Sequence, residues 1–289
     1  MVCELAHPAR TRGSPPQTRD TPARIAPRIA TYGGRHSRRG GGTKRSARRF
    51  DDMEPICCNR VLRALSSGAL NLVLDASERI DLDVETVLAR EGETTYWVYF
   101  PENAVISTLS TYEDGSIIEM ANIGRESCTG INLMLGNPTQ FNTDVVQVGG
   151  SAFRMSAERF LNLQSSLPEF ERVLFAAIQS VFYQVMVSGA CNGVHDTRQR
   201  LARWLLTMDD RIDRDVMQLT HGFLAEFLAV RRATVTEIAA QLQRDGIIEY
   251  ARGKIRITDR PALEAVSCEC YSRVCTAVDT MLPDLSEVD

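Results

Sequence analysis

Residues 220–258 decide the fold of this chain; they read THGFLAEFLAVRRATVTEIAAQLQRDGIIEYARGKIRIT. The first part predicts a short helix, because Thr220 is a capping residue and apolar side chains recur on one helical face after it. The second part has the same periodicity and predicts another helix. Its expected buried stripe consists of Val235, Ile238, Ala239 and Leu242. This helix should end at Gly246, because glycine tolerates the left-handed conformation.

Two short β-rich runs follow, residues 247–250 and 254–258, and Arg252-Gly253 between them predicts a hairpin. Two helices joined by a tight turn and followed by a two-stranded ribbon are typical of a winged helix-turn-helix. Its second helix would enter a major groove and its ribbon, the wing, would contact the DNA backbone. The candidate DNA-binding residues are Arg231, Arg232, Thr234, Thr236, Glu237, Gln241, Arg252, Lys254 and Arg256.

The same pattern also has an ordinary explanation. Amphipathic helix pairs and hairpins occur in many folds, and surface arginines are usually only solvated. Two features favour DNA binding. Arg231 and Arg232 stand at the start of the second helix, where groove contacts are made, and the cations of the wing stand where phosphates would lie.

The motif FLAEFLAVRRATVTEIAAQLQRDGIIEYARGKIRITDRPAL, within residues 196–263, resembles the C-terminal domain of Crp/Fnr-type bacterial transcription regulators. The resemblance extends to the layout from residue 53 onward and implies a sensor roll followed by a long helix. Many members read a shared half-site with a Glu and an Arg on the recognition helix. This chain has Ala233 and Glu237 at the aligned positions, whereas Arg232 matches the first basic contact. The resemblance therefore implies DNA binding and leaves the preferred sequence open.

Charge is distributed unevenly along the 289 residues. Residues 1–50 hold 12 of the 33 Lys and Arg but two of the 37 Asp and Glu, so the remainder holds 21 basic and 35 acidic residues. Any nucleic-acid contact of this acidic remainder must be a local basic patch. Residues 1–52 predict a disordered basic arm. It could grip DNA, act as a transit-like peptide, or be upstream sequence translated from a misassigned start before Met53.

Residues 53–165 predict the sensor domain. Short β-rich runs from residue 78 to 155 are separated by turn signals, of which Asp114-Gly115 is the strongest. This pattern predicts a small antiparallel barrel or jelly roll, and the resemblance implies a cyclic-nucleotide-binding-like domain.

The phosphate site that the resemblance implies is altered in this chain. Cyclic-nucleotide-binding members carry an Arg-Ser or Arg-Thr pair for the cyclic phosphate, but this chain has Asn142-Thr143, followed by Asp144. Arg125 is the nearby candidate replacement, although an ion-paired or solvated role is the alternative for it. A phosphate without a paired cation would be poorly stabilised. We therefore expect a degenerate pocket that takes neither cyclic AMP nor cyclic GMP, with an unknown effector.

Residues 166–192 predict a long helix, because VLFAAIQSVFYQVMVSGAC contains no charged residue. A single membrane-spanning helix is an alternative. The polar residues within the stretch, its acidic start and the folded-domain patterns on both sides argue against it. We predict a dimerisation helix instead, with a homodimer forming through residues 168–192. The predicted seam consists of Phe170, Leu174, Ala177, Val181, Val185 and Ser188.

The eight cysteines include no C-x-x-C pair and the chain has no secretory signal, which predicts a reduced, cytoplasmic protein. Cys57-Cys58 do not reproduce the spaced run that holds an iron–sulfur cluster in some members of the family. Cys268, Cys270 and Cys275 are expected on one helix as idle thiols, with redox sensing as the alternative. The sequence predicts no cofactor and no metal site.

The complete prediction is an α+β chain. An antiparallel β-roll is followed by the dimerisation helix, a winged helix-turn-helix over residues 193–263, and a C-terminal helix and tail over residues 264–289. The function that follows is a dimeric, sequence-specific transcription regulator that binds double-stranded DNA and RNA polymerase and no membrane. The alternative is a ligand or redox sensor module that no longer binds DNA.

An enzyme is not expected. The sequence has no HExxH, GxSxG, P-loop or Rossmann fingerprint. His195 and His221 stand at predicted helix starts, where a capping or solvated role is expected.

Overall fold

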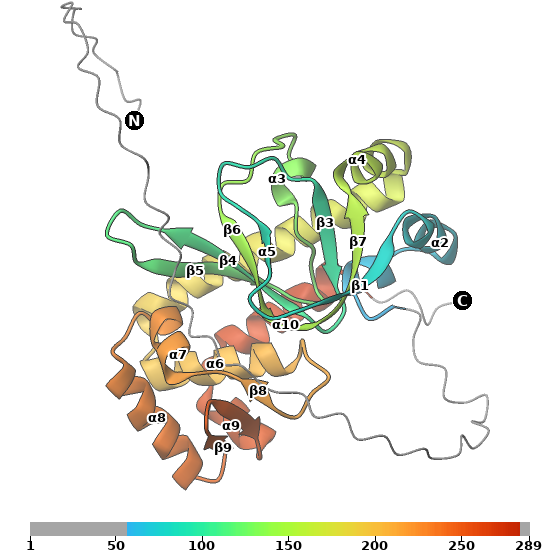
Figure 1. Cartoon of the computed structure of the whole chain (residues 1–289). Helices are drawn as coiled ribbons and strands as arrows, with labels where there is room; N and C mark the ends of the chain where they lie inside the picture. The colour runs from blue at the N-terminus through green and yellow to red at the C-terminus, as the bar shows by residue number, and fades with distance from the viewer. Residues whose placement is uncertain (1–56, 284–289) are drawn as a thin grey trace, which may run out of the picture. The chain divides into compact units, whose positions relative to one another are not determined.

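The computed structural model describes residues 57–283 (Figure 1). The predicted basic arm, its alternative start at Met53 and the end of the acidic tail lie outside these residues. Within them the predicted α+β fold is confirmed. An antiparallel roll comes first, a long helix follows, and a helical segment with a three-stranded ribbon completes the described chain.

The roll consists of two antiparallel sheets with strand orders β1-β7-β3 and β2-β6-β4-β5. Its strands are β1 (Glu78–Leu82), β2 (Val87–Ala89), β3 (Trp97–Pro101), β4 (Val105–Thr111), β5 (Ile117–Ile123), β6 (Thr143–Val148) and β7 (Gly150–Ser156). Its helices are α1 (Arg60–Arg63), α2 (Ser67–Asp75), α3 (Ile131–Met134) and α4 (Ala157–Ser166). Asp114-Gly115 turns the chain between β4 and β5 as predicted, because Gly115 adopts a φ of 81° that other residues rarely reach.

Helix α5 (Pro168–Val194) follows the roll and starts at a proline, which a first helical turn tolerates. Phe170 packs with Phe100 and Phe160 in an aromatic group whose ring centroids lie 5.7–6.4 Å apart. In the part of the chain that the structure describes, α5 is the one helix long and apolar enough to cross a membrane, by length and composition alone.

The predicted dimer seam on α5 is wrong for most of its length. Its members Phe170, Leu174, Ala177 and Val181 are buried within the chain itself, the first three in the core cluster that α5 shares with the roll. A different apolar face is exposed, formed by Phe175, Phe182 and Met186, whose exposed fractions are 48%, 62% and 49%. Both faces have helical spacing, so the sequence pattern alone could not tell which one turns inward.

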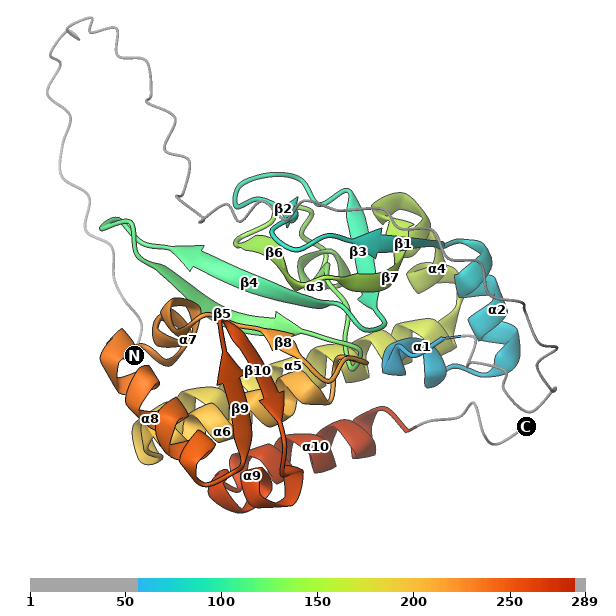
Figure 2. The same ribbon diagram turned by 60° about the horizontal axis from the view of Figure 1, so that its bottom comes forward.

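The C-terminal segment contains the two helices and the ribbon predicted from residues 220–258, with additional elements on either side. Its helices are α6 (Thr197–Asp209), α7 (His221–Leu228), α8 (Arg232–Arg244), α9 (Arg260–Val266) and α10 (Cys270–Met281). Its ribbon has the strand order β8-β10-β9, with β8 (Met217–Gln218), β9 (Ile248–Ala251) and β10 (Lys254–Ile257) (Figure 2). The strand β8 was not predicted, because two residues leave no recognisable sequence period.

Helix α6 supports helices α7 and α8. Asp196 and Gln199 form a capping box at its start, which satisfies otherwise free N–H groups. Trp204 is buried and contacts the rings of Phe223 and Phe227 at centroid distances of 5.9 and 5.1 Å. The core under the helix-turn-helix is therefore anchored on α6.

The last helix leaves this core and returns to the roll. Leu282, just after α10, is buried in the same cluster as Phe100 and Phe160. Arg60 of α1 pairs with Asp279 at 2.8 Å and donates a hydrogen bond to the carbonyl of Leu282 at 3.1 Å. The C-terminal helix thus contributes to both parts of the described chain.

Candidate nucleic-acid interface

The predicted buried stripe of α8 positions its outer face. Val235, Ile238, Ala239 and Leu242 are all buried in the core shared with α6 and α7. This packing leaves Arg231, Arg232, Thr236 and Glu237 exposed, whereas Thr234 and Gln241 are half-buried. The structure therefore brings four of the six predicted helix contacts fully to the surface at the start of α8.

The first turn of α8 is open to a ligand. Its N-cap residue is Arg231, whose side chain makes no capping hydrogen bond. The first backbone N–H groups of a helix lack intrahelical partners and lie at the positive end of the helix dipole. With Arg231 and Arg232 beside them, these N–H groups form a surface that attracts phosphate.

His221, the first residue of α7, contacts both α8 and the wing. Its ring stacks on Tyr250 of β9 with centroids 4.1 Å apart and an interplanar angle of 16°. Its Nδ1 lies 2.9 Å from Oγ1 of Thr236, and that hydroxyl also donates to the carbonyl of Arg232. Burial, and secondarily the charge of Arg232, lower the pKa of His221. The expected capping or solvated role of His221 is therefore wrong, because the ring packs on Tyr250 and bonds to Thr236. The sequence could not show this, since Tyr250 lies on a later strand.

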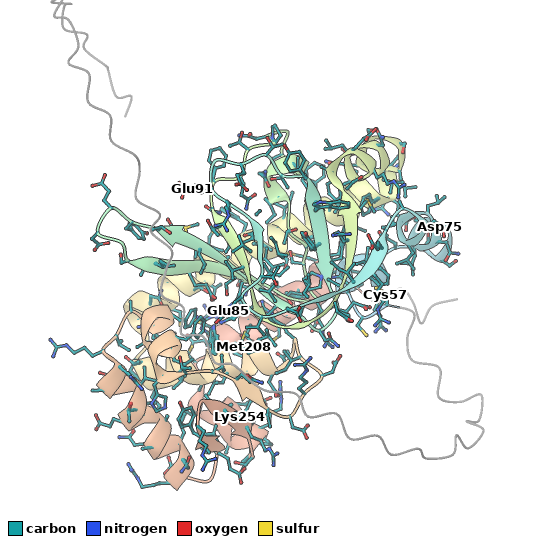
Figure 3. The ribbon with its side chains drawn as sticks, in the orientation of Figure 1. Cys57, Asp75, Glu85, Glu91, Met208 and Lys254 are labelled. Carbon is teal, nitrogen blue, oxygen red and sulfur yellow. The ribbon has the colours of Figure 1, made fainter. Side chains whose placement is uncertain are left out.

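The wing turn has the geometry predicted for a hairpin. Arg252 and Gly253 have φ values of 51° and 74°, so both central residues are left-handed, as in a type I′ turn. The three predicted wing cations Arg252, Lys254 and Arg256 are exposed (Figure 3 labels Lys254). Arg256 lies 3.9 Å from Glu249, with both side chains more than half exposed, so this pair is weak and leaves Arg256 accessible.

A separate cavity of about 470 Å³ lies between the roll and α5. Its lining includes Thr108, Gln140 and Asp144 from the roll and Val181 and Val185 from α5. Among the described residues that line it there is no Lys, Arg or His.

Asp144 is buried beside this cavity. Its carboxylate accepts hydrogen bonds from Oγ1 of Thr108 at 2.8 Å and Nε2 of Gln140 at 3.0 Å. Burial nevertheless raises the pKa of Asp144 to about 6, because desolvation outweighs the two hydrogen bonds.

Arg125, the candidate cation for a phosphate in the roll, is engaged elsewhere. Its guanidinium pairs with Asp213 at 2.6 Å and donates to the carbonyl of Arg211 at 3.0 Å. It is absent from the lining of the cavity that holds Asp144. The ion-paired alternative for Arg125 is therefore confirmed, and Asp213 is the partner that the sequence could not indicate.

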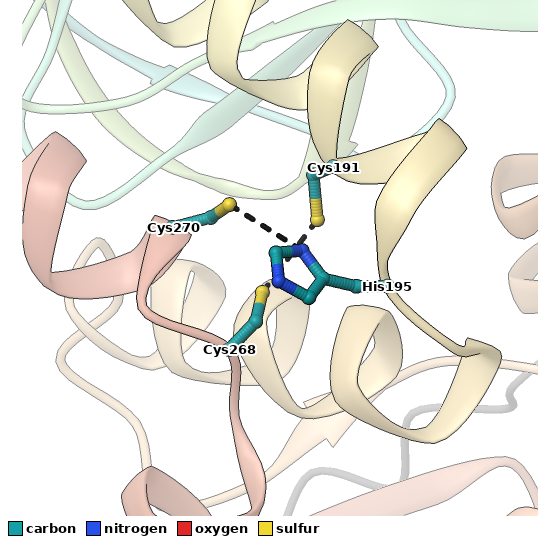
Figure 4. A group of neighbouring side chains, drawn as sticks. All are labelled: Cys191, His195, Cys268 and Cys270. Carbon is teal, nitrogen blue, oxygen red and sulfur yellow. Dashed lines mark hydrogen bonds between the residues drawn. The ribbon is translucent and has the colours of Figure 1, made fainter.

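Four side chains that could bind a metal converge beside the start of α6 (Figure 4). They are Cys191, His195, Cys268 and Cys270, whose sulfur and nitrogen atoms all lie within 4.8 Å of one another. The sequence predicts idle thiols and no metal site here. The two halves of the group are separated by more than seventy residues, so no local spacing connects them. The sequence also predicts Cys268 and Cys275 on one helix, whereas α10 begins only at Cys270.

Comparison with known proteins supports the C-terminal assignment. The family model of the Crp-like helix-turn-helix domain matches residues 199–266. No curated protein matches the sequence.

Several solved structures share the fold. FixK2 from Bradyrhizobium japonicum is 17% identical with a TM-score of 0.57, covering 66% of this chain and 98% of its own. The c-di-GMP-responsive global regulator CLP from Xanthomonas campestris is 15% identical with a TM-score of 0.54, covering 66% of this chain and 99% of its own. A CRP-family transcriptional regulator from Thermus thermophilus is 19% identical with a TM-score of 0.54, covering 66% of this chain and 96% of its own. The chain therefore carries a Crp-like helix-turn-helix domain within the fold of the Crp/Fnr regulators.

Proposed function

We propose that this protein is a Crp/Fnr-type transcription regulator that binds double-stranded DNA as a homodimer. The observation that carries the proposal is the uncapped, cationic first turn of α8, exposed on a helix whose opposite side is fully buried. A helix held in this way can enter a major groove without losing core contacts.

The proposed DNA contacts divide into two kinds. Arg232 and its exposed neighbours on α8 would read base edges, because a guanidinium can donate two hydrogen bonds to guanine. Arg252, Lys254 and Arg256 would contact phosphates and set the position of the domain. Glu237 could accept a hydrogen bond from a cytosine amino group, which would favour a half-site different from the one read by an Arg at this position.

The exposed apolar face of α5 supports the dimer. Phe175, Phe182 and Met186 recur at intervals of seven and four residues and form one stripe on the helix. A second copy of α5 is the proposed partner, since a two-fold axis would place two α8 helices about 34 Å apart on an operator with two half-sites. In this arrangement α5 serves in assembly and spans no membrane.

The roll is proposed to sense a ligand other than a cyclic nucleotide. Residues 53–165 would form the sensor, residues 166–192 the dimer helix and residues 193–263 the DNA-binding domain. The cavity between the roll and α5 contacts Val181 and Val185, so a ligand there would touch the proposed dimer helix directly. The protein would act in the cytoplasm and influence RNA polymerase at the promoter, without catalysing a reaction.

Selection of bound DNA from a random pool by the full-length protein tests this proposal. We expect a motif with two related halves spaced by about one helical turn. Selection with and without reductant shows whether the thiols modulate binding. Failure to enrich any motif, together with binding that is indifferent to Arg232→Ala, would favour the alternative of a sensor module that no longer binds DNA.

A further inference from the structure

We propose that Cys191, His195, Cys268 and Cys270 bind one Zn²⁺ ion as a closed structural site. The four residues come from two links that lie far apart in the sequence. Cys191 is in the last turn of α5 and His195 in the link to α6. Cys268 lies in the link between α9 and α10, and Cys270 is the first residue of α10. Figure 4 shows the four side chains pointing toward one common centre.

Two of the ligand–ligand distances match a single tetrahedral ion, and all of them are within 4.8 Å. With Zn–S bonds of about 2.3 Å and a Zn–N bond of about 2.0 Å, neighbouring ligand atoms of a tetrahedron are about 3.5–3.8 Å apart. The Sγ atoms of Cys191 and Cys268 are 3.6 Å apart, and Sγ of Cys270 is 3.6 Å from Nδ1 of His195. An iron–sulfur cluster would need a wider arrangement, because its four protein ligands are divided among at least two iron atoms.

The histidine has the second partner that a metal ligand normally has. Nε2 of His195 lies 3.2 Å from a carboxylate oxygen of Glu269, so Nε2–H can donate a hydrogen bond to Glu269. That hydrogen bond selects the tautomer in which Nδ1 carries a free lone pair, and Nδ1 is the nitrogen that faces the thiols. Glu269 is therefore a positioning residue for the ligand.

Burial and ligand type together select a structural zinc ion. The three cysteines are buried, and the side chain of His195 is 13% exposed. Three thiolates and an imidazole suit Zn²⁺, and four protein ligands leave no open position for a substrate. Binding would release three thiol protons, so the three thiolates, the neutral imidazole and the ion would together carry one negative charge.

A disulfide between Cys191 and Cys268 is the competing arrangement. Its sulfur atoms would have to approach to about 2.05 Å, and the bond would leave Cys270 and His195 without a role. The ion accounts for all four side chains and for the orientation set by Glu269. The ion would join the link before α6 to the link after α9, and these links flank the matched helix-turn-helix domain. If the proposed function holds, the ion would keep helices α7 and α8 at a fixed angle to α5.

The test measures metal in the purified full-length protein and needs no DNA. After exposure to Zn²⁺ and removal of the excess, we expect about one zinc per chain by elemental analysis. Replacement by Co²⁺ should produce the strong visible bands of tetrahedral cobalt and a thiolate-to-cobalt charge-transfer band. Cys268→Ser and Cys270→Ser should abolish both signals. Cys275→Ser is the matched control, because Cys275 lies on α10 outside the group and should retain them.

Glu269→Gln tests the positioning role in a variant that retains all four ligands. We expect its affinity for Zn²⁺ to fall at least about 10-fold against a chromophoric chelator, while the cobalt spectrum stays tetrahedral.

Several results would overturn the proposal. One is wild-type protein without stoichiometric zinc, and another is octahedral cobalt without a charge-transfer band. A third is unchanged zinc in Cys270→Ser, and a fourth is a Cys191–Cys268 disulfide, seen by mass spectrometry, in protein kept with reductant. The wild-type cobalt spectrum decides the question even if the cysteine variants fail to fold. Loss of DNA binding in a protein that keeps its zinc would instead count against the proposed function.

Discussion

Arg211 forms a bidentate ion pair with the carboxylate of Glu126 and thereby joins the loop after α6 to the turn after β5. One of the two hydrogen bonds runs from Nε to Oε2 at 3.1 Å, and Nη2 donates the other to Oε1. Arg211 is 3% exposed, so both charges depend on each other for solvation. A Cβ atom at Gly124 would overlap the Arg211 side chain, which explains the glycine at that position.

Arg211→Met should therefore destabilise the protein by about 3–5 kcal/mol, because it leaves Glu126 charged and buried without a partner. The double variant Arg211→Met/Glu126→Leu should recover most of that loss. Urea unfolding of the three proteins gives the comparison. If the double variant is as unstable as the single one, the pair stabilises the fold by more than the neutralisation of its two buried charges.

Arg232→Ala should weaken binding to the selected operator by about 1–3 kcal/mol if Arg232 makes a bidentate base contact. Lys254→Ala should weaken all sequences alike and flatten the plot of log affinity against log salt by about one unit. Arg90→Ala removes an exposed cation from the roll and is the matched control. Titrations at two salt concentrations distinguish the three variants. If all three have the same affinity and the same salt dependence, α8 and the wing do not contact DNA.

Phe182→Glu should convert the dimer to monomers, since it places a charge in the centre of the exposed apolar face of α5. Leu72→Glu makes the same change at an exposed apolar residue of α2, 54% exposed, and should leave the dimer intact. Sedimentation at micromolar concentration measures both. A wild-type protein that sediments as a monomer, with or without operator DNA, would contradict the assembly proposed for α5.

Neither cyclic AMP nor cyclic GMP should bind in the cavity beside α5. A cyclic phosphate there would meet the Asp144 carboxyl and no described cation. Loss of a charge-assisted hydrogen bond is worth about 1.5–3 kcal/mol, which lowers affinity by roughly one to two powers of ten. Calorimetry at millimolar nucleotide tests this expectation. Saturable heat that disappears in a cavity variant such as Val185→Trp would refute it.

Asp144 should give the protein a measurable pH dependence. Burial raises the pKa of its carboxyl from 3.8 to about 6, so the folded state retains a proton that the unfolded state has already lost. The contribution of Asp144 to the free energy of unfolding is fully present below pH 4. It is lost as pH rises through about 6, which lowers the free energy of unfolding by about 3 kcal/mol. Asp144→Asn should remove that loss.

Urea unfolding at several pH values between 4 and 8 provides the measurement. Asp83→Asn, an exposed carboxyl of the roll, is the control and should keep the wild-type profile. An Asp144→Asn profile parallel to that of the wild type would show that Asp144 does not titrate in this range.

The sequence was sufficient for the elements with a strong period. The stripe from Val235 to Leu242 and the turn at Arg252-Gly253 appear in the structure where they were predicted, because local geometry alone determines them. The hydrophobic pattern could not predict contacts between segments that are distant in the sequence. The inward face of α5 depends on the position of the roll, and the partners of Arg125 and His221 come from distant segments.

The cluster of Cys191, His195, Cys268 and Cys270 also depends on contacts between distant segments. Cys191 and Cys268 meet across 77 residues, so no spacing rule for a single segment could connect them. The orientation of the Asp144 side chain could not be predicted for a different reason, since alternation along a strand allows either face. Its burial beside Thr108 shows that it turns inward.

The return of α10 to the roll imposes an order on folding. Arg60 and Leu282 meet across 222 residues, and Leu282 fills part of the apolar cluster around Phe100. Contacts of such long sequence separation form late, because a large loop must close first. During synthesis the roll emerges from the ribosome before Leu282 exists, so its apolar gap stays open until the helix-turn-helix has also been made. The roll is therefore made before the helix-turn-helix segment, yet it is among the last parts of the described chain to be completed.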